Sequence, residues 1–258
     1  MVRLLNIEFL KLQRNRSFLI LMALFAISTF GVNYIASEII TNSPLSHSFV
    51  KFSDVWEIVP YVSSYLLIIL AFITIMQTCS EYTYHTHRQN VIDGLSRSQY
   101  ITAKILFIVV LALFATVITF ISAFVMGISS YSSVSFEGFR FIFYFFVQTI
   151  AYLSFAFLFA LTIKKSAPAI GIFFIYSLII ENILEKYINK IITGIDKTGG
   201  FLPISSSEHL LLPDKVKNLL KIVNISDPHP EYAYLIASIV YIALCYFTCF
   251  YRYKKMDL

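Results

Sequence analysis

Long apolar stretches separated by short polar segments run through almost the whole chain. Five stretches contain no Asp, Glu, Lys or Arg, and a sixth is interrupted only by Glu181. Each is long enough for an α-helix to cross a hydrocarbon core, which takes about 20 residues. None alternates apolar and polar residues as barrel strands do. The pattern predicts an all-α membrane protein, one domain over residues 1–258, with six spans at about 17–37, 58–80, 101–129, 139–163, 166–186 and 232–251.

Composition supports a lipid environment, because hydrophobic residues make up 58% of the chain and charged residues only 14%. Soluble domains carry about 25% charged residues to cover their surface. The basic residues flank the apolar stretches and form no single patch, which argues against nucleic-acid binding. The three cysteines, Cys79, Cys245 and Cys249, lie in or beside apolar stretches, so we expect buried free thiols.

The distribution of Lys and Arg predicts the orientation, since these residues concentrate in cytoplasmic loops. One set of flanks holds Arg3, Lys11, Arg14, Arg16, Arg88, Arg97, Lys104, Lys164, Lys165, Arg252, Lys254 and Lys255. The short loops on the other side hold only Lys51 and Arg140. Both termini are therefore expected in the cytoplasm.

The N-terminal segment 1–16 has a helical stripe of apolar residues, Val2, Leu5, Phe9 and Leu12, although Leu4, Ile7 and Leu10 fall off it. We expect a helix lying in the cytoplasmic interface. A plain cationic flank of the first span is the alternative.

The polar segment 81–104 separates the second and third spans and is too long for a tight turn. Asp93-Gly94 predicts a helix end, because Gly accepts the left-handed conformation after a last turn. Ser96 with Gln99 predicts a capping box that opens the third span. The segment is either a docking helix for a soluble partner or a solvated connector. Because His85 and His87 would point to different helix faces, no metal site is predicted, and no cofactor site is predicted.

The loop of about 185–231 contains Pro and Gly-Gly breaks, yet it keeps the apolar groups Phe201-Leu202 and Leu210-Leu211-Leu212. A solvated loop does not need them. We expect one or two short helices that rest on the membrane or dip into it.

Glu181 and Asn182 are polar residues inside the fifth span. A carboxylate at membrane depth usually faces protein or water, so both residues are candidates for a transport pathway or gate. Proximity to the outer headgroups is the alternative. Gln77 and Gln148 are predicted to bond across helices.

The string EYTYHTHRQNVIDGLSRSQYITAK at 81–104 resembles the connection between the second and third spans of type-2 ABC exporter permeases. That family has an acidic residue ending the second span, a turn-Thr-Arg element and a Leu-Ser-Arg-type motif before a Lys. The matching positions here are Glu81, Thr86-His87-Arg88, Leu95-Ser96-Arg97 and Lys104. The opening LLNIEFLKLQRNRSF is similar to the family's interfacial helix, and the likeness is greatest to permeases of Bacteroidetes-type bacteria.

The resemblance implies a multi-pass subunit of the bacterial cytoplasmic (inner) membrane, surrounded by lipid, that pairs as a homodimer or heterodimer. A separate cytosolic ABC ATPase would drive it, and the chain itself has no G-x-x-x-x-G-K-[ST] motif. The residues that would couple to the ATPase are Glu81, Thr86, Arg88, Gln89, Asn90, Asp93, Gly94, Leu95, Ser96 and Arg97.

Two other classes of protein remain open on sequence. An intramembrane protease or lipid-modifying enzyme needs a nucleophile and a base at depth, but all five histidines lie outside the apolar stretches and H-E-x-x-H is missing. A stand-alone secondary carrier is expected to show related halves, and no internal repeat is visible.

Overall fold

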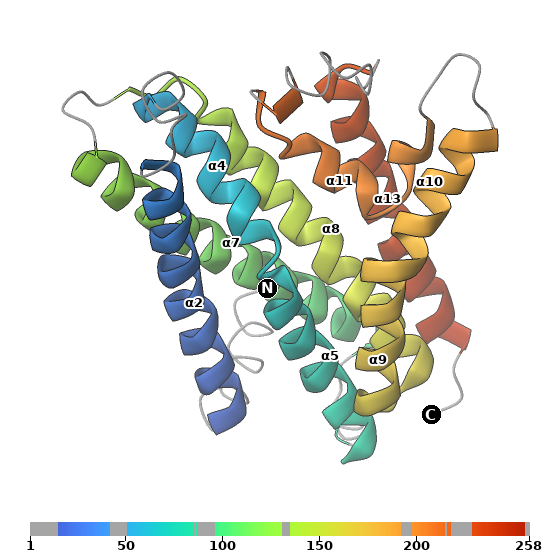
Figure 1. Ribbon diagram of the computed structural model, residues 1–258. Helices are drawn as coiled ribbons and strands as arrows, with labels where there is room; N and C mark the ends of the chain where they lie inside the picture. Colours follow the sequence, from blue (N-terminus) through green and yellow to red (C-terminus); the bar gives the residue numbers. More distant parts are fainter. Residues whose placement is uncertain are drawn as a thin grey trace.

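The computed structural model describes residues 15–41, 51–84, 86, 96–130, 135–191, 198–214, 216–217 and 229–255. The predicted interfacial helix at 1–16 therefore lies almost wholly outside the described residues. Within them every regular element is a helix, and the helices run side by side as a bundle (Figure 1). Figure 1 also defines the two ends used below: α5 and α13 end, and α9 begins, at the lower end, whereas α11 lies at the upper end.

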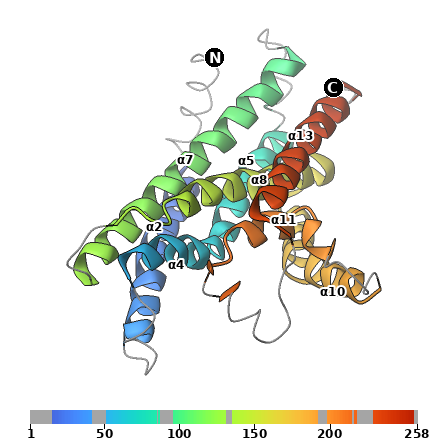
Figure 2. The same cartoon turned by 90° about the horizontal axis from the view of Figure 1, so that it is seen from above.

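Four spans are continuous helices close to the predicted limits. They are α2 (Arg16–Thr41), α7 (Arg97–Ser130), α8 (Arg140–Ile163) and α13 (Glu231–Lys255). Each is long and apolar enough to cross a membrane. Viewed from above, α7 and α13 lie on two sides of α8 (Figure 2). The prediction of an all-α membrane protein is confirmed.

The second span differs from the prediction of one helix beginning near residue 58. It consists of α4 (Phe52–Ser64) and α5 (Leu67–Thr83), which meet at a bend of 42°. Counted together, this bent pair is the sixth candidate span. At the bend the backbone N–H of Leu66 bonds to the carbonyl of Ser63, a tight contact that interrupts the α-helical ladder.

The fifth span is longer than predicted, and its middle is not an ordinary α-helix. It runs through α9 (Ser166–Ile175), the π-helical η1 (Tyr176–Ile180) and α10 (Glu181–Ile191). A π-helical turn widens the helix and changes which side chains face the bundle, and such turns are frequent at functional sites. Here the widened turn comes directly before Glu181.

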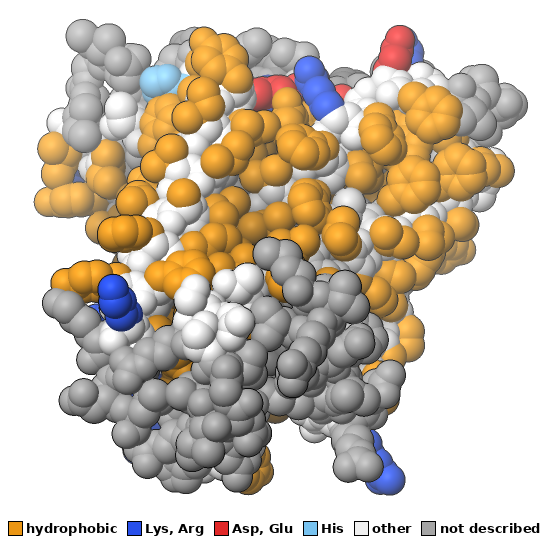
Figure 3. Space-filling model, turned by 180° about the vertical axis from the view of Figure 1, so that it is seen from behind, with side chains coloured by type: hydrophobic (Ala, Val, Ile, Leu, Met, Phe, Trp, Pro, Cys, Tyr) orange, Lys and Arg blue, Asp and Glu red, His pale blue; other side chains and the backbone are white. Residues whose placement is uncertain are grey.

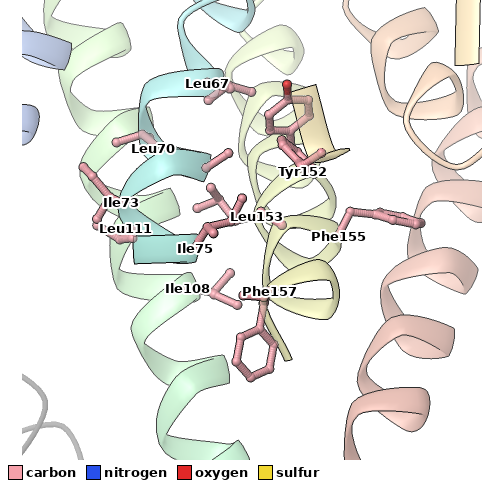
Figure 4. Packing of buried hydrophobic residues seen from close by; sticks show 14 of the residues in the cluster. Leu67, Leu70, Ile73, Ile75, Ile108, Leu111, Tyr152, Leu153, Phe155 and Phe157 are labelled. Atoms are coloured by element: carbon pink, nitrogen blue, oxygen red, sulfur yellow. The ribbon is translucent and has the colours of Figure 1, made fainter. Parts of the chain in front are cut away.

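α8 is the central helix of the bundle. In its most apolar 18-residue stretch 67% of the residues are buried, against 17% in α2 and 22% in α13. Figure 4 shows α5 and α7 packed on one side of it, with Leu153 among side chains from both. Phe155 points the other way, toward α13. These contacts belong to one continuous apolar core that also includes Phe157 and Ile108.

The outer surface is apolar where a soluble protein would be polar. Ile27 and Phe247 are 72% and 70% exposed. In Figure 3 hydrophobic side chains cover most of the described surface, with few charged ones among them. Such a surface is stable in lipid.

The loop after the fifth span folds onto the upper end of the bundle. It contains the short helices η2 (Thr198–Phe201) and α11 (Ser205–Leu210). Ile204, Leu210 and Leu211 are at most 1% exposed, and α11 contacts α8 and α13. Short helices were predicted here, but their apolar residues pack on protein instead of resting on the membrane.

Candidate functional site

The end of α5 and the start of α7 are joined by a buried polar cluster around Glu81. The Lys104 ammonium lies 2.7 Å from Glu81 Oε1, and the hydroxyl of Tyr100 donates to Oε2 at 2.8 Å. All three residues are at most 3% exposed. The sequence placed Glu81 and Lys104 on a polar surface segment. Glu81 is instead buried, and its bonds join the end of α5 to the start of α7.

The predicted capping box is confirmed at the start of α7. The side chain of Gln99 accepts from the backbone N–H of Ser96 at 2.8 Å, and Ser96 Oγ accepts from the N–H of Gln99 at 3.2 Å. The cap satisfies two N–H groups that the first helical turn leaves free. It fixes where the chain leaves the preceding segment and enters the bundle.

Most of the predicted coupling residues lie between Glu81 and Ser96 and outside the described residues. They are Arg88, Gln89, Asn90, Asp93, Gly94 and Leu95. The side chain of Arg97, at the start of α7, is likewise outside the described part of the chain. Thr86 is described, and its hydroxyl lies 3.5 Å from the backbone oxygen of Glu81.

The same cluster reaches the last span, which the sequence did not predict. The Tyr100 ring stacks on the ring of Tyr253 with centroids 4.7 Å apart and planes 13° apart. Tyr253 belongs to the last turns of α13 and is 3% exposed. Spans two, three and six therefore meet where the 84–96 connection begins and ends.

Glu181 is buried at the upper end and holds the loop helix in place. Its Oε1 accepts the backbone N–H groups of Ile204 at 2.5 Å and Ser205 at 2.9 Å. These groups begin α11, where a carboxylate is favoured by free donors and by the helix dipole. Glu181 is 1% exposed, so its side chain faces protein. Asn182 points elsewhere: its amide donates to the carbonyl of Leu178, and it lines a cavity.

A cluster of charged groups ties the outer loop to the bundle. Arg140 at the start of α8 lies 2.8 Å from Asp214, and Lys217 lies 2.7 Å from Glu231 at the start of α13. The backbone N–H of Asp214 donates to Glu57 of α4 at 2.9 Å. Sequence reasoning treated Arg140 only as a loop charge, because its partners are far away along the chain.

A cavity of about 370 Å³ opens between α4, α5, α8, the fifth span and α11. Its described lining includes Glu185 and Asn182 from the fifth span and Glu208 and His209 from α11. His209 Nε2 lies 3.0 Å from Glu185 Oε1, and the His209 ring stacks on Tyr234. The structure thus brings Asn182 together with acidic residues that the sequence did not select.

Glu208 has an unusual environment within this cavity. Glu208 is itself an exposed residue, but it lies on the cavity wall with Glu185 and His209. The pKa of Glu208 is raised to about 7, first by desolvation and then by the carboxylates of Glu181 and Glu185, while His209 lowers it.

Gln148 of α8 also lines the cavity, and its predicted bond across helices is wrong for the side-chain oxygen. The residue is 2% exposed, and within the described part of the chain Oε1 has no hydrogen-bond partner. The three cysteines, in contrast, are buried and free as predicted.

The fold and these sites define a multi-pass helical membrane protein whose spans are cross-linked by buried polar groups. A family model described as ABC-2 family transporter protein matches residues 4–180, more than half of the 258 residues. The chain belongs to the ABC-2 transporter family and is a membrane permease of an ABC transporter. Members of this family are transporter components that partner with an ABC ATPase and are not themselves catalytic. No curated protein matches the chain.

The limits of the family match separate the two sites. The predicted coupling residues at 81–97 lie inside the matched region, whereas Glu181, the outer loop and α13 come after its last residue, Ile180. The residues that α10 and α11 contribute to the cavity therefore lie outside the matched region.

Proposed function

We propose that the chain is the permease subunit of an ATP-driven exporter in the bacterial inner membrane, working as a homodimer or heterodimer. A cytosolic ABC ATPase binds the segment between α5 and α7, and the lower end of the bundle faces the cytoplasm. Support for export and for this contact comes from the resemblance of residues 81–104 to type-2 exporters.

The observation that carries the proposal is the buried Glu81–Tyr100–Lys104 cluster. Glu81 lies just before the proposed docking segment, and Tyr100 and Lys104 lie just after it. The Ser96 cap marks the end of the segment at the start of α7. A buried, charged cluster resists separation, because pulling its partners apart leaves an uncompensated charge in a low-dielectric interior. A push on the segment is therefore transmitted to α5 and α7 together, and through Tyr253 to α13.

The proposed pathway includes Asn182 and the cavity at the opposite end of the bundle. Glu181 supports this region by fixing α11. The bend between α4 and α5 and the π-helical turn η1 both lie in the spans that line the cavity. Such irregular backbone gives these spans places where their halves can move against each other.

Co-purification tests the coupling contact. The tagged chain is isolated with its ATPase, and the variants Arg88→Ala and Asp93→Ala are compared with wild type for retained ATPase and for stimulated ATP hydrolysis. We expect both variants to lose association. Arg140→Ala removes an exposed arginine at the other end of the bundle and is the matched control. Unchanged association and hydrolysis in both variants would rule out this contact.

Labelling tests the orientation. The native cysteines are buried, so an added exposed cysteine is the main target of a membrane-impermeant maleimide. Ser98 is exposed at the start of α7, and Glu137 is exposed in the turn just before α8. We expect Glu137→Cys to react in intact cells and Ser98→Cys to react only after the membrane is opened; the reverse pattern would invert the topology.

A further inference from the structure

The cavity at the upper end is lined by acidic groups and by no Lys or Arg among its described residues. Glu185 and Glu208 both line it, and only His209 is a potential cation on that surface. His209 is already paired with Glu185, so Glu208 is the acidic group without a cationic side chain bonded to it in the described residues. Any charge selection by this cavity favours cations.

A second observation points independently to a ligand. Gln148 lies eight residues beyond the start of α8 at Arg140, about 12 Å along the helix, and is 2% exposed. Gln148 is one of the lining residues, and its buried Oε1 has no hydrogen-bond partner within the described residues. A buried amide oxygen without a hydrogen bond is costly, and a polar ligand or water in the cavity would satisfy it.

The remaining walls are aromatic and apolar. Tyr61 and Tyr65 line one side, where their rings meet edge to face at 5.6 Å. The lining also includes Tyr152, Phe174, Ile68 and Leu178. Faces of aromatic rings attract cations, and the volume of about 370 Å³ falls within the range of small-molecule sites.

We propose that this cavity binds a lipophilic organic monocation, an ammonium- or phosphonium-type centre with an apolar body. Glu208 faces the positive centre, the tyrosines surround it, and the apolar body packs toward Phe174 and Leu178 while Gln148 meets a polar group or a bridging water. That such a cation is the transported substrate rests on the proposed function. Its binding to the cavity can be measured without the ATPase.

The probe is tetraphenylphosphonium, and its control is tetraphenylborate, which presents the same phenyl shell with the opposite charge. Equilibrium dialysis of the detergent-purified full chain measures how much of each ion the protein retains. The blank is the same detergent without protein. We expect wild type to retain tetraphenylphosphonium above the blank and tetraphenylborate at the blank level. Equal retention of both ions would overturn recognition by charge.

Glu208→Gln keeps the shape and removes the charge. We expect tetraphenylphosphonium to bind about tenfold more weakly, the scale of losing one charge contact in a partly enclosed site. Glu137→Gln removes an exposed carboxylate outside the cavity and should bind like wild type. Gln148→Leu is a second variant that leaves all charges in place and should weaken binding less. Unchanged binding in Glu208→Gln would overturn the proposal.

The ATPase co-purification assay on the same preparations separates the two proposals. Wild type that retains ATPase but holds no tetraphenylphosphonium above the blank overturns the cavity inference alone. Charge-dependent binding in a chain that associates with no ATPase supports the cavity and contradicts the proposed function.

Discussion

The ammonium of Lys104 lies 2.7 Å from Glu81 Oε1, and the two side chains are 1% and 4% exposed. The partners stand 23 residues apart in the sequence, at the end of α5 and in the second turn of α7. Tyr100 completes the cluster by donating to the other carboxylate oxygen. The pair thus closes the connection that contains the proposed ATPase contact.

Lys104→Met should strongly destabilise the protein. The change removes the ammonium but keeps a flexible stem of similar length, so the carboxylate of Glu81 stays buried without its counter-charge. Breaking one side of a buried pair costs about 3–5 kcal/mol. The measurement is the apparent melting temperature of the purified variant in detergent.

Two comparisons make this prediction specific. Glu81→Gln combined with Lys104→Met removes both charges and should recover most of the loss. Asp214→Asn weakens the Arg140 pair, whose side chains are 51% and 41% exposed, and exposed pairs contribute only about 0–1 kcal/mol. A double variant as unstable as the single one would contradict the buried-charge explanation.

Glu181→Ala and Glu181→Gln separate the hydrogen bonds of Glu181 from its charge. Alanine leaves the buried N–H groups of Ile204 and Ser205 without an acceptor, at about 1–3 kcal/mol each. Glutamine keeps an acceptor oxygen, so we expect melting near that of wild type. If both variants melt equally low, the negative charge and not the acceptor geometry holds α11.

Gly199→Ala should loosen the outer loop, whereas Gly171→Ala should not. A Cβ on Gly199 would lie 2.5 Å from the backbone oxygen of Glu185 and 2.8 Å from Asn189 Oδ1. Because the backbone cannot move aside easily, we expect the free energy of unfolding to fall by about 1–3 kcal/mol. A Cβ on Gly171 meets nothing within 4 Å. Thermal melting of the two variants checks the difference, and equal melting would show that the loop is not held this closely.

Binding of tetraphenylphosphonium should weaken as the pH falls from 8 to 6. With the pKa of Glu208 raised to about 7, the free carboxyl is about nine-tenths ionised at pH 8 and about one-tenth at pH 6. Only the ionised form attracts the cation, so affinity is present above pH 7 and lost below it. Dialysis at a series of pH values measures this.

The groups facing Glu208 are Glu181 and Glu185 of the fifth span, its neighbour His209, and the Tyr65 and Tyr152 hydroxyls. Protonation of His209 would act in the same direction as that of Glu208. Glu208→Gln distinguishes the two, since it should flatten most of the pH profile. A profile as steep as that of wild type would assign the dependence to His209.

Sequence alone determined that the chain is an all-α membrane protein, because uninterrupted apolar stretches of span length have no other stable form in lipid. It also located the start of α7, since Ser96 and Gln99 act within one helical turn. The family resemblance likewise rests on local residues at 81–104, and the family match includes that segment.

Only the tertiary structure decided which polar residues meet. Glu81 and Lys104 read as surface charges along the chain, and Glu181 as an isolated carboxylate, because their partners are 19 to 24 residues away. The cavity likewise needs Gln148, Glu185 and Glu208 from three elements. Apolar periodicity specifies that a helix spans the membrane, but side-chain packing between helices determines which polar groups are buried together.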